Sequence, residues 1–307
     1  MKYQPNIEKQ IELIIPFIKN IKPINYFPIL KISNDLGIKT IMGIGGSHIY
    51  YGQIKKGQVL KENVLPLPTP KYFFRDIIFN AQNLGYINNK IKMINCIFSY
   101  PFESIEKNGL IRGKYTGDKN EGKKTPFNEK NFFIDDILQK YIPYHLDFNV
   151  VNDSVSTNIY NMYLNKGYDL YISVLSGTGV NFSYTKDDKV INTEIGREKI
   201  LKNPFTNELV PIQFLTSHQN IKKISKKYRV DYTLLEEQSA KILTSIILGI
   251  IKSVNSKKTS IIAQGSFITI DINYFEKIYS FLKQYLQEKD FIFIKDNKAD
   301  IKGASLI

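Results

Sequence analysis

The chain has 307 residues, and its 42 Lys and Arg against 29 Asp and Glu give a formal net charge of +13. This length is sufficient for two packed lobes. Hydrophobic residues make up 43% of the chain and no low-complexity block interrupts them, which argues against an intrinsically disordered protein.

Membrane, secretory and metal-cluster classes are disfavoured by the same sequence. The longest apolar runs, such as residues 243–251, fall short of the roughly 20 residues that cross a bilayer. Residues 1–20 lack the apolar core and cleavage site of a signal peptide, so we expect a cytoplasmic protein without a membrane span. Cys96 is the only cysteine and the three histidines are scattered, which argues against a disulfide framework and a structural zinc site.

The excess of Lys and Arg is dispersed along the chain. Its densest stretch, residues 222–229, has helical spacing and predicts one solvated helix face. We therefore expect no nucleic-acid partner, although the same charge would attract an anionic small substrate such as a nucleotide.

In chain order, the first clear elements are a hairpin and a strand. Residues 39–60 predict two strands with glycines at the first corner and a second turn at Lys56-Gly57. Residues 91–99 predict a strand, residues 109–122 an exposed loop, and residues 131–141 an amphipathic helix.

The second half of the chain alternates strands and helices. An apolar strand at residues 147–151 ends in Asn152-Asp153 and leads into a helix that stops at Gly167. Further strands are predicted at residues 170–175, 260–264 and 291–294, a hairpin at Asp187-Asp188, and long helices at residues 234–250 and 275–286. This alternation predicts an α/β class with a mixed sheet.

Three glycine corners follow apolar strands, at Gly45-Gly46-Ser47, Gly177-Thr178-Gly179 and Gly265-Ser266. Glycine allows backbone amides to crowd an anion, and hydroxyls add donors, so such corners can hold phosphates. Each corner alone is better explained as a tight turn, but three in one chain favour a nucleotide site. The sequence has neither a P-loop nor a dinucleotide-binding fingerprint.

Asp153 stands between a strand and a helix, where ligand sites are common in α/β folds. Its carboxylate could accept a proton from a hydroxyl group that attacks phosphorus. The alternative role is a helix N-cap, which the residues alone favour because Asp serves well there.

Several segments occur in the order of one family's motifs. IMGIGGSHIYYG resembles that family's first phosphate motif, FSYP at residues 98–101 its sugar-binding segment, and VNDSVST at residues 151–157 its Val-Asn-Asp-Thr-Val-x-Thr signature. SGTGVNFSY resembles its second phosphate motif, INTEIG its Ile-Asn-x-Glu-x-Gly motif, and Gln264-Gly265-Ser266 with residues 303–306 its adenosine and closing segments. Through these collinear matches, which span residues 38–307, the chain resembles the hexokinase family of the actin-like sugar kinases.

The resemblance implies a two-lobed actin-like ATPase fold, related to ribonuclease H, with mixed sheets and a central cleft. Residues 36–152 would form the small lobe, with the sugar-binding and first phosphate motifs. Residues 153–307 would form the large ATP-binding lobe, with residues 1–35 packed against it. The implied reaction is phosphorylation of a hexose, most simply glucose, at its 6-hydroxyl with ATP and Mg²⁺.

The resemblance also assigns roles to individual residues. Asp153 would be the general base. The sugar hydroxyls, which need many convergent donors and acceptors, would be bound by Ser99, Thr116, Asn152, Asn181 and Glu194. ATP would be held by Gly45, Gly46, Ser47, Gly177, Thr178, Gly179, Gly265, Ser266 and Gly303.

The chain departs from the family pattern at three places. The acidic residue that helps to hold magnesium and phosphate in the family is replaced by Gly43, and Asp35 is poorly placed to substitute for it. Gly117 follows Thr116 where the family has Lys, and Lys114 or Lys119 would have to reach in. Glu208 is the only candidate for a further sugar-binding Glu.

Two functions therefore stay open at the level of sequence. One is an active hexokinase, acting on glucose or on another hexose such as mannose, fructose or an N-acetylated hexosamine. The other is a degenerate hexokinase-like protein that binds sugar, or a protein partner, without catalysis. The polar residues of the site favour the enzyme, whereas Gly43 and Gly117 favour the degenerate protein.

Overall fold

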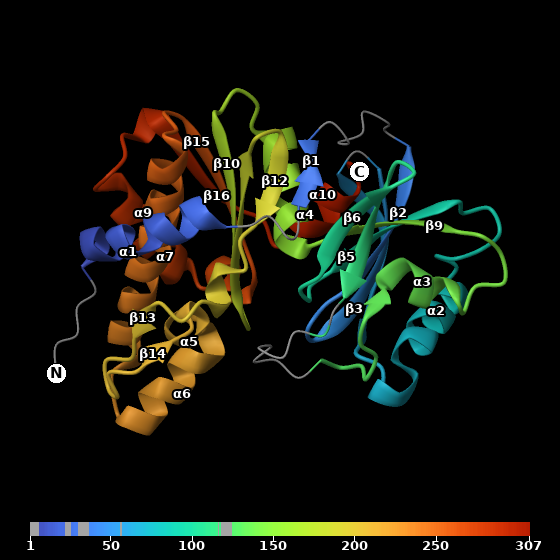
Figure 1. Ribbon diagram of the computed structural model, residues 1–307, viewed down its shortest axis with the longest axis horizontal. Coiled ribbons are helices and arrows are strands. Elements are labelled where there is room, and N and C mark those ends of the chain that lie inside the picture. The colour runs from blue at the N-terminus through green and yellow to red at the C-terminus, as the bar shows by residue number, and fades with distance from the viewer. Residues whose placement is uncertain (1–5, 22–25, 30–36, 56, 116, 118–124) are drawn as a thin grey trace. The chain divides into compact units, whose positions relative to one another are not determined.

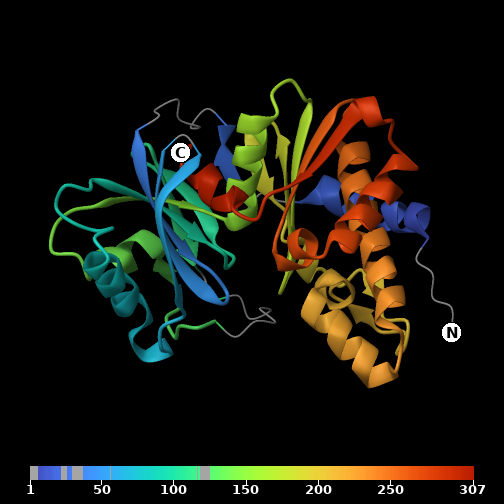
Figure 2. The same ribbon diagram turned by 180° about the vertical axis from the view of Figure 1, so that it is seen from behind.

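The computed structural model describes residues 6–21, 26–29, 37–55, 57–115, 117 and 125–307 (Figures 1 and 2). The chain forms two compact units. The first unit comprises Met1–Pro23, Asn161–Asp187 and Ile191–Lys298, and the second comprises Ile24–Tyr160, Asp188–Val190 and Ala299–Ile307. This division differs from the expected boundary between residues 152 and 153.

The first unit contains a large sheet, a small two-stranded sheet and several helices. Its helices are α1 (Ile7–Asn20), α5 (Ile212–Thr216), α6 (His218–Tyr228), α7 (Tyr232–Val254), α8 (Ser266–Ile270) and α9 (Ile272–Lys283). Its strands are β10 (Leu170–Ser176), β11 (Val180–Lys186), β12 (Lys189–Asn192), β13 (Leu201–Lys202), β14 (Leu209–Val210), β15 (Thr259–Gln264) and β16 (Phe291–Lys295).

Within the first unit, the large sheet has the order β12-β11-β10-β15-β16, and β13 pairs with β14 in the small sheet. β10 is antiparallel to β11 and parallel to β15, so the sheet is mixed, as the sequence predicted. α1 and α9 both pack against α7, the long helix drawn in orange in Figures 1 and 2. The isoleucines of α1 at positions 7, 11, 14 and 18 are buried in the core that these helices share with the sheet.

Two helices of the first unit begin directly after residues whose side chains cap them. The side chain of Asn6 accepts a hydrogen bond from the backbone N–H of Lys9, and Asp231 accepts one from Thr233 at 2.8 Å. α7 ends at Asn255, which adopts a left-handed conformation. The stretch at residues 222–229 lies on α6 and at its end, with Ile221 and Ile224 buried and the lysines exposed, which confirms the predicted solvated face.

The second unit contains a larger and a smaller sheet. Its strands are β1 (Tyr26–Pro28), β2 (Ile38–Ile44), β3 (His48–Lys55), β4 (Gln58–Pro66), β5 (Met93–Phe98), β6 (Glu103–Lys107), β7 (Leu110–Tyr115), β8 (Phe132–Phe133) and β9 (Asp147–Val151). Its helices are α2 (Phe73–Asn83), α3 (Ile134–Gln139), α4 (Asp153–Leu164), which continues into the first unit, and α10 (Ala299–Ala304).

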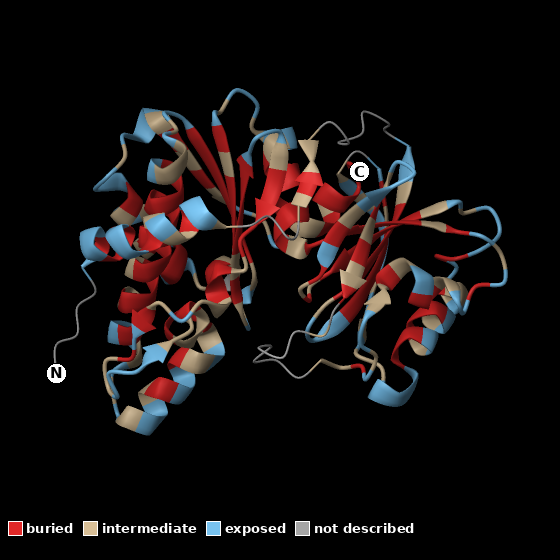
Figure 3. Ribbon diagram, viewed as in Figure 1, coloured by how far each residue is buried: buried red, intermediate tan, exposed pale blue. Residues whose placement is uncertain are grey.

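The larger sheet has the order β4-β3-β2-β5-β9 and the smaller one the order β6-β7-β8. β2, β5 and β9 are parallel to one another, whereas β3 and β4 continue the sheet in antiparallel fashion. Buried residues line these strands and the facing sides of α2 and α3 (Figure 3). The predicted hairpin at residues 39–60 and the strand at residues 147–151 are confirmed.

Two predictions for the second unit are wrong. Residues 110–115, expected in a loop, form β7, which pairs with β6 and β8. The helix expected at residues 131–141 is restricted to α3, because Phe132 and Phe133 join the small sheet. In both places strand pairing, which a local pattern does not contain, determines the conformation.

α10 joins the second unit through a close approach to α4. A Cβ atom on Gly303 would lie 1.8 Å from the carbonyl oxygen of Ser156, so only glycine permits this spacing. The Ser156 hydroxyl also donates a hydrogen bond to the carbonyl of Asp300. These contacts explain why residues 153–160 and the closing segment belong with the second unit.

Among the described residues, no helix is long and apolar enough to span a membrane.

Candidate active site

One edge of the larger sheet gathers the predicted residues of the second unit. β2, β5 and β9 end side by side, with Ile44 opposite Phe98 and Ile97 opposite Val151. The backbone N–H of Ser99 donates to Ile44, which places Ser99 next to the Gly45-Gly46-Ser47 corner. Parallel strands therefore bring the first phosphate corner, Ser99 and Asp153 to the same edge, as expected for a site in an α/β fold.

The glycine corner itself is open and shaped by a few bonds. The N–H of Gly45 donates to the carbonyl of His48 at 3.1 Å, and the hydroxyl of Tyr100 donates to the carbonyl of Gly45. Gly46 and Ser47 are exposed, and the Ser47 hydroxyl lies 2.9 Å from Nδ1 of His48. An anion at this corner would meet the backbone amides of Gly46 and Ser47, which make no hydrogen bond within the hairpin turn, and the hydroxyl of Ser47.

Asn152 and Asp153 occupy different positions at the start of α4 and make different hydrogen bonds. Asn152 accepts the first helical bond, from Ser156 to its carbonyl, and its Oδ1 accepts from the N–H and the hydroxyl of Ser154 at 3.0 and 2.8 Å. Asn152 therefore occupies the capping position and is 1% exposed. Asp153 is the first residue inside the helix, is partly exposed, and accepts from Ser154 at 2.8 Å.

Asn152, and not Asp153, therefore occupies the N-cap position of α4. An acidic side chain in the first turn is also favoured by the helix dipole, which stabilises the ionised carboxylate. Asp153 is partly exposed in the first turn of α4, whereas the side chain of Asn152 is buried and donates to the carbonyl of Phe98.

Tyr50 covers the position where the family has its acidic residue. Gly43 pairs with Tyr50 across β2 and β3, and a Cβ atom on Gly43 would lie 3.2 Å from the Cβ of Tyr50. The Tyr50 hydroxyl donates to Glu62 at 3.2 Å, and burial, aided by Glu62, raises the pKa of Tyr50. The Tyr50 hydroxyl is therefore hydrogen-bonded to Glu62 on β4, and the carboxylate of Asp300 also raises the pKa of Tyr50.

Two glycine corners meet in the first unit. β10 and β15 are parallel, with Leu175 opposite Gln264, so the corners at Gly177–179 and Gly265-Ser266 follow neighbouring strand ends. A Cβ atom on Gly265 would lie 2.5 Å from the carbonyl oxygen of Ser176, and Gly265 has a φ of 107°, so both space and conformation require glycine. The two corners form one cradle of small residues in which Thr178 and Ser266 are exposed.

A polar network connects β11, β12 and the turn that follows. Asn181 donates to Asn192 at 2.7 Å, and Asn192 donates to Oε1 of Glu194 at 2.6 Å. Glu194 is a non-glycine residue with a φ of 49°, an unusual conformation that the network and the neighbouring Arg197, at 3.2 Å, hold in place. Arg197 was not predicted as a residue of the site, although its position three residues after Glu194 is a spacing that favours an ion pair.

Gly196 fixes this turn against the sheet. A Cβ atom there would lie 1.8 Å from the carbonyl oxygen of Val180, which begins β11 directly after the glycine corner. The network that contains Glu194 and the corner at Gly177–179 are therefore held at the same end of β11.

An aromatic stack borders the cradle. The backbone N–H of His218 donates to the carbonyl of Gly177, and its ring stacks on Phe267, with centroids 4.7 Å apart. Phe267 in turn stacks on Tyr274 at 3.9 Å, and the Tyr274 hydroxyl is hydrogen-bonded to Ser239. The stack of His218, Phe267 and Tyr274 therefore packs beside the glycine corner. Its rings carry no charge at neutral pH.

The stack predicts a pH dependence of stability. Burial lowers the pKa of His218 from 6.5, and Lys222 adds to this effect, so folding favours the neutral ring. Stability is therefore full above the unfolded-state pKa and falls as the pH decreases through it. We expect His218→Phe, which keeps the stack, to reduce the loss of thermal stability between about pH 7.5 and 5.5.

The control for this experiment is Tyr232→Phe, which alters the ring next to His218 without removing a histidine. Tyr232 has a pKa raised by burial to about 12 and does not titrate in this window. Equal pH slopes for the wild type and His218→Phe would contradict the role of His218.

The remaining predicted residues lie elsewhere in the described structure or outside the described residues. Thr116 and Lys119 lie outside the described residues, as does Asp35. Gly303, expected near adenosine, packs on Ser156 within the second unit. Glu208 is not in a helix: it is exposed, before β14, and its carboxylate accepts from the hydroxyl of Thr206.

Metal ligation has few candidates. No group of three or more His, Cys, Asp and Glu side chains that could hold a metal ion occurs in the part of the chain that the structure describes. In the second unit Gly43 offers no ligand, and a carboxylate added there would press on Tyr50.

Comparison with known proteins gives likenesses of structure. No protein-family model and no curated protein matches the sequence. A hexokinase from Schistosoma mansoni complexed with glucose has a TM-score of 0.69 at 14% identity, covering 99% of this chain and 96% of that chain. A ROK-family glucokinase from Streptomyces griseus, in complex with glucose and AMPPNP, has a TM-score of 0.60 at 13% identity, covering 88% and 98%.

A third likeness is to a protein of another function. A ROK-family transcriptional regulator, a homologue of the E. coli MLC protein, has a TM-score of 0.65 at 14% identity and covers 88% of this chain and 77% of that chain. At these identities the likeness shows the fold. The chain has the actin-like ATPase fold that hexokinases and ROK proteins share, which confirms the predicted fold class.

Proposed function

We propose that the protein is a sugar kinase that transfers the γ-phosphoryl group of ATP to the 6-hydroxyl of a hexose, most simply glucose. The observation that carries this proposal is the arrangement at the start of α4. Asn152 caps the helix, so the carboxylate of Asp153 is placed by the fold at the edge where the first phosphate corner also ends.

The proposed chemistry assigns Asp153 one task. Its carboxylate accepts the proton of the sugar hydroxyl as that oxygen bonds to phosphorus and the bond from phosphorus to the β-γ bridging oxygen breaks. MgATP supplies the phosphoryl group, with the metal neutralising charge on the phosphate oxygens. The amide of Gly46 and the hydroxyl of Ser47 are candidate donors to those oxygens, together with the cradle at Gly177–179 and Gly265-Ser266.

Sugar recognition is assigned to the network in the first unit and to Ser99. Asn181, Asn192 and Glu194 present amide and carboxylate groups that are already oriented by mutual hydrogen bonds. A polyol binds best to donors and acceptors that need no reorganisation, and such pre-oriented groups provide them. The likeness to glucose complexes of a hexokinase and of a glucokinase supports this class of substrate.

We expect Glu194→Gln to weaken glucose binding by about tenfold to a hundredfold, the effect of removing a charged hydrogen-bond acceptor. Calorimetric titration of the full chain with glucose measures this change. The matched control is Glu208→Gln, which removes an exposed carboxylate from the same unit and should leave affinity unchanged. Equal affinities of both variants would exclude Glu194 as a sugar ligand.

A second candidate function is sugar binding without catalysis. Two observations favour it: Gly43 and Tyr50 leave no acidic side chain at the family's metal-phosphate position, and one protein of the same fold is a transcriptional regulator. The two functions differ in one observable. Both predict sugar binding, but only the kinase predicts ADP release that depends on sugar.

A further inference from the structure

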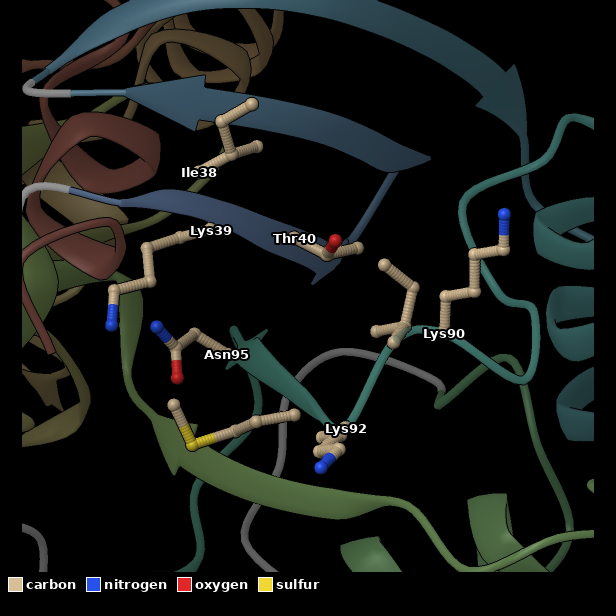
Figure 4. A pocket seen from close by; sticks show the side chains of 8 residues that line it. Ile38, Lys39, Thr40, Lys90, Lys92 and Asn95 are labelled. Carbon is tan, nitrogen blue, oxygen red and sulfur yellow. The ribbon is translucent and has the colours of Figure 1, made fainter.

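A hollow in the second unit lies at the edge of the larger sheet opposite the candidate active site. It has a volume of about 230 Å³ and is lined by Ile38, Lys39, Thr40, Lys90, Lys92 and Asn95, together with Ile91 and Met93 (Figure 4). β2 and β5 are parallel and begin here, whereas Gly45 and Ser99 follow their other ends. No residue assigned to sugar or ATP lines this hollow.

The hollow is rich in positive charge. Lys39, Lys90 and Lys92 carry ammonium groups around it (Figure 4). Within the described residues, Lys90 and Lys92 have no carboxylate partner. The nearest acidic residue in register is Asp147, opposite Met93, and its carboxylate is paired with His145 at 3.1 Å. The local field therefore favours an anion.

Asn95 adds a buried acceptor to this wall. The residue is 1% exposed, and its Nδ2 donates to the carbonyls of Ala304 and Ile307 at 2.7 and 3.3 Å, which fixes the orientation of the amide. Its Oδ1 has no hydrogen-bond partner among the described residues. A buried acceptor without a donor is costly, and a bound group with a hydroxyl would supply the missing donor.

Charge and acceptor together define the chemistry of the ligand. A phosphate group that keeps one proton offers negative oxygens to the lysines and one P–OH donor to the Oδ1 of Asn95. A phosphate monoester has its second pKa close to 6, so the protonated form is accessible near neutral pH. Sulfate is fully ionised at this pH and has no such donor.

We propose that this hollow is a binding site for phosphate or a small phosphate ester, separate from the candidate active site. The Lys90 and Lys92 ammonium groups bind the charged oxygens, and Oδ1 of Asn95 accepts a hydrogen bond from the remaining P–OH group after a small shift of the side chains around it. Binding at this place does not depend on the proposed kinase function.

The site is connected by direct contacts to α4. Asn95 holds the end of α10, and α10 packs on Ser156 of α4 through Gly303. Asp153 is three residues before Ser156. An occupant of the hollow therefore acts on the same packed elements that place the proposed catalytic carboxylate.

The test is calorimetric titration of the full chain, without nucleotide or sugar, with inorganic phosphate, glucose 6-phosphate and sulfate at constant ionic strength. We expect at least one of the two phosphate compounds to bind about tenfold more tightly than sulfate. Their relative affinities identify whether free phosphate or an ester is the occupant, and either result supports the site. Equal binding of sulfate would overturn the role of Asn95.

Charge variants locate the site. We expect Lys90→Gln combined with Lys92→Gln to weaken phosphate binding by about tenfold or more, because both charges line the hollow. Lys107→Gln combined with Lys140→Gln removes the same charge from exposed positions of the same unit and should leave binding unchanged. An equal loss in both double variants would overturn the proposal, since the effect would then be that of net charge.

Hydrogen exchange separates this site from the glycine cradle. With saturating phosphate, we expect added protection in peptides that cover residues 37–44 and 86–95. Protection confined to residues 176–179 and 265–266 would overturn the proposal and would instead report the phosphate cradle. Absence of turnover in a kinase assay would not affect either result, so failure of the two proposals is distinguishable.

Discussion

An Asp153→Asn variant is expected to release ADP about 10²–10⁴-fold more slowly than the wild type in the presence of MgATP and hexose, the usual contribution of a general base. Asparagine has nearly the same shape but cannot accept the proton of the sugar hydroxyl. Its side-chain oxygen can still accept from Ser154, so the start of α4 is preserved. Sugar affinity and thermal stability should therefore change little.

The matched control is Asp231→Asn. Asp231 also lies at a helix start, where its carboxylate accepts a hydrogen bond from Thr233, and Asn caps a helix as well as Asp does. This variant should keep wild-type turnover. Similar losses in both variants would show that helix capping, and not proton transfer, limits activity.

We expect a large loss of stability in a Gly303→Ala variant. The new Cβ would lie 1.8 Å from the carbonyl oxygen of Ser156, a backbone atom that cannot rotate away, so α10 must move off α4. We expect the free energy of unfolding to fall by about 3 kcal/mol, the upper range for overpacking. Chemical denaturation followed by far-ultraviolet circular dichroism measures this change.

Gly249→Ala is the control for Gly303→Ala. Gly249 also lies in a helix, but the atom that a Cβ would meet, at 2.8 Å, is the side-chain Cγ2 of Ile14, which can adjust. Alanine is also the better helix former, which offsets part of the cost. If both substitutions cost the same, backbone contact with Ser156 would not be what holds α10.

Elements with a complete local pattern could be predicted from the sequence. The hairpin of β2 and β3 has apolar strands and glycines at its corner, and β9 followed by α4 has an apolar run, a cap and helical spacing. The glycines at positions 196 and 265 were found as motif residues, and the structure gives their physical reason as contacts with Val180 and Ser176.

The elements that were missed depend on distant contacts. β7 has Arg112 and Gly113 within it and reads as a loop, but its pairing with β6 and β8 makes it a strand. α1 was not predicted as a helix; residues 1–35 were expected only to pack against the larger lobe, and the structure shows that α1 packs on α7. Local patterns do not encode such pairings.

For the candidate site, the sequence predicted residue types better than their environments. It identified Asp153 but could not decide between cap and base, because that depends on whether Asn152 takes the capping bonds. It identified the missing acid at Gly43, but not that Tyr50 covers the position or that Arg197 pairs with Glu194. These are contacts between side chains, which spacing alone does not fix.

ADP release by the wild type is the direct measure of whether the protein phosphorylates a hexose. The assay is performed with MgATP, with and without glucose, beside the Asp153→Asn variant and with glucose binding measured on the same samples. We expect ADP release that requires glucose and that is lost in the Asp153→Asn variant. Glucose binding with ADP release no faster than in Asp153→Asn would contradict it and would favour a sugar-binding protein without kinase activity.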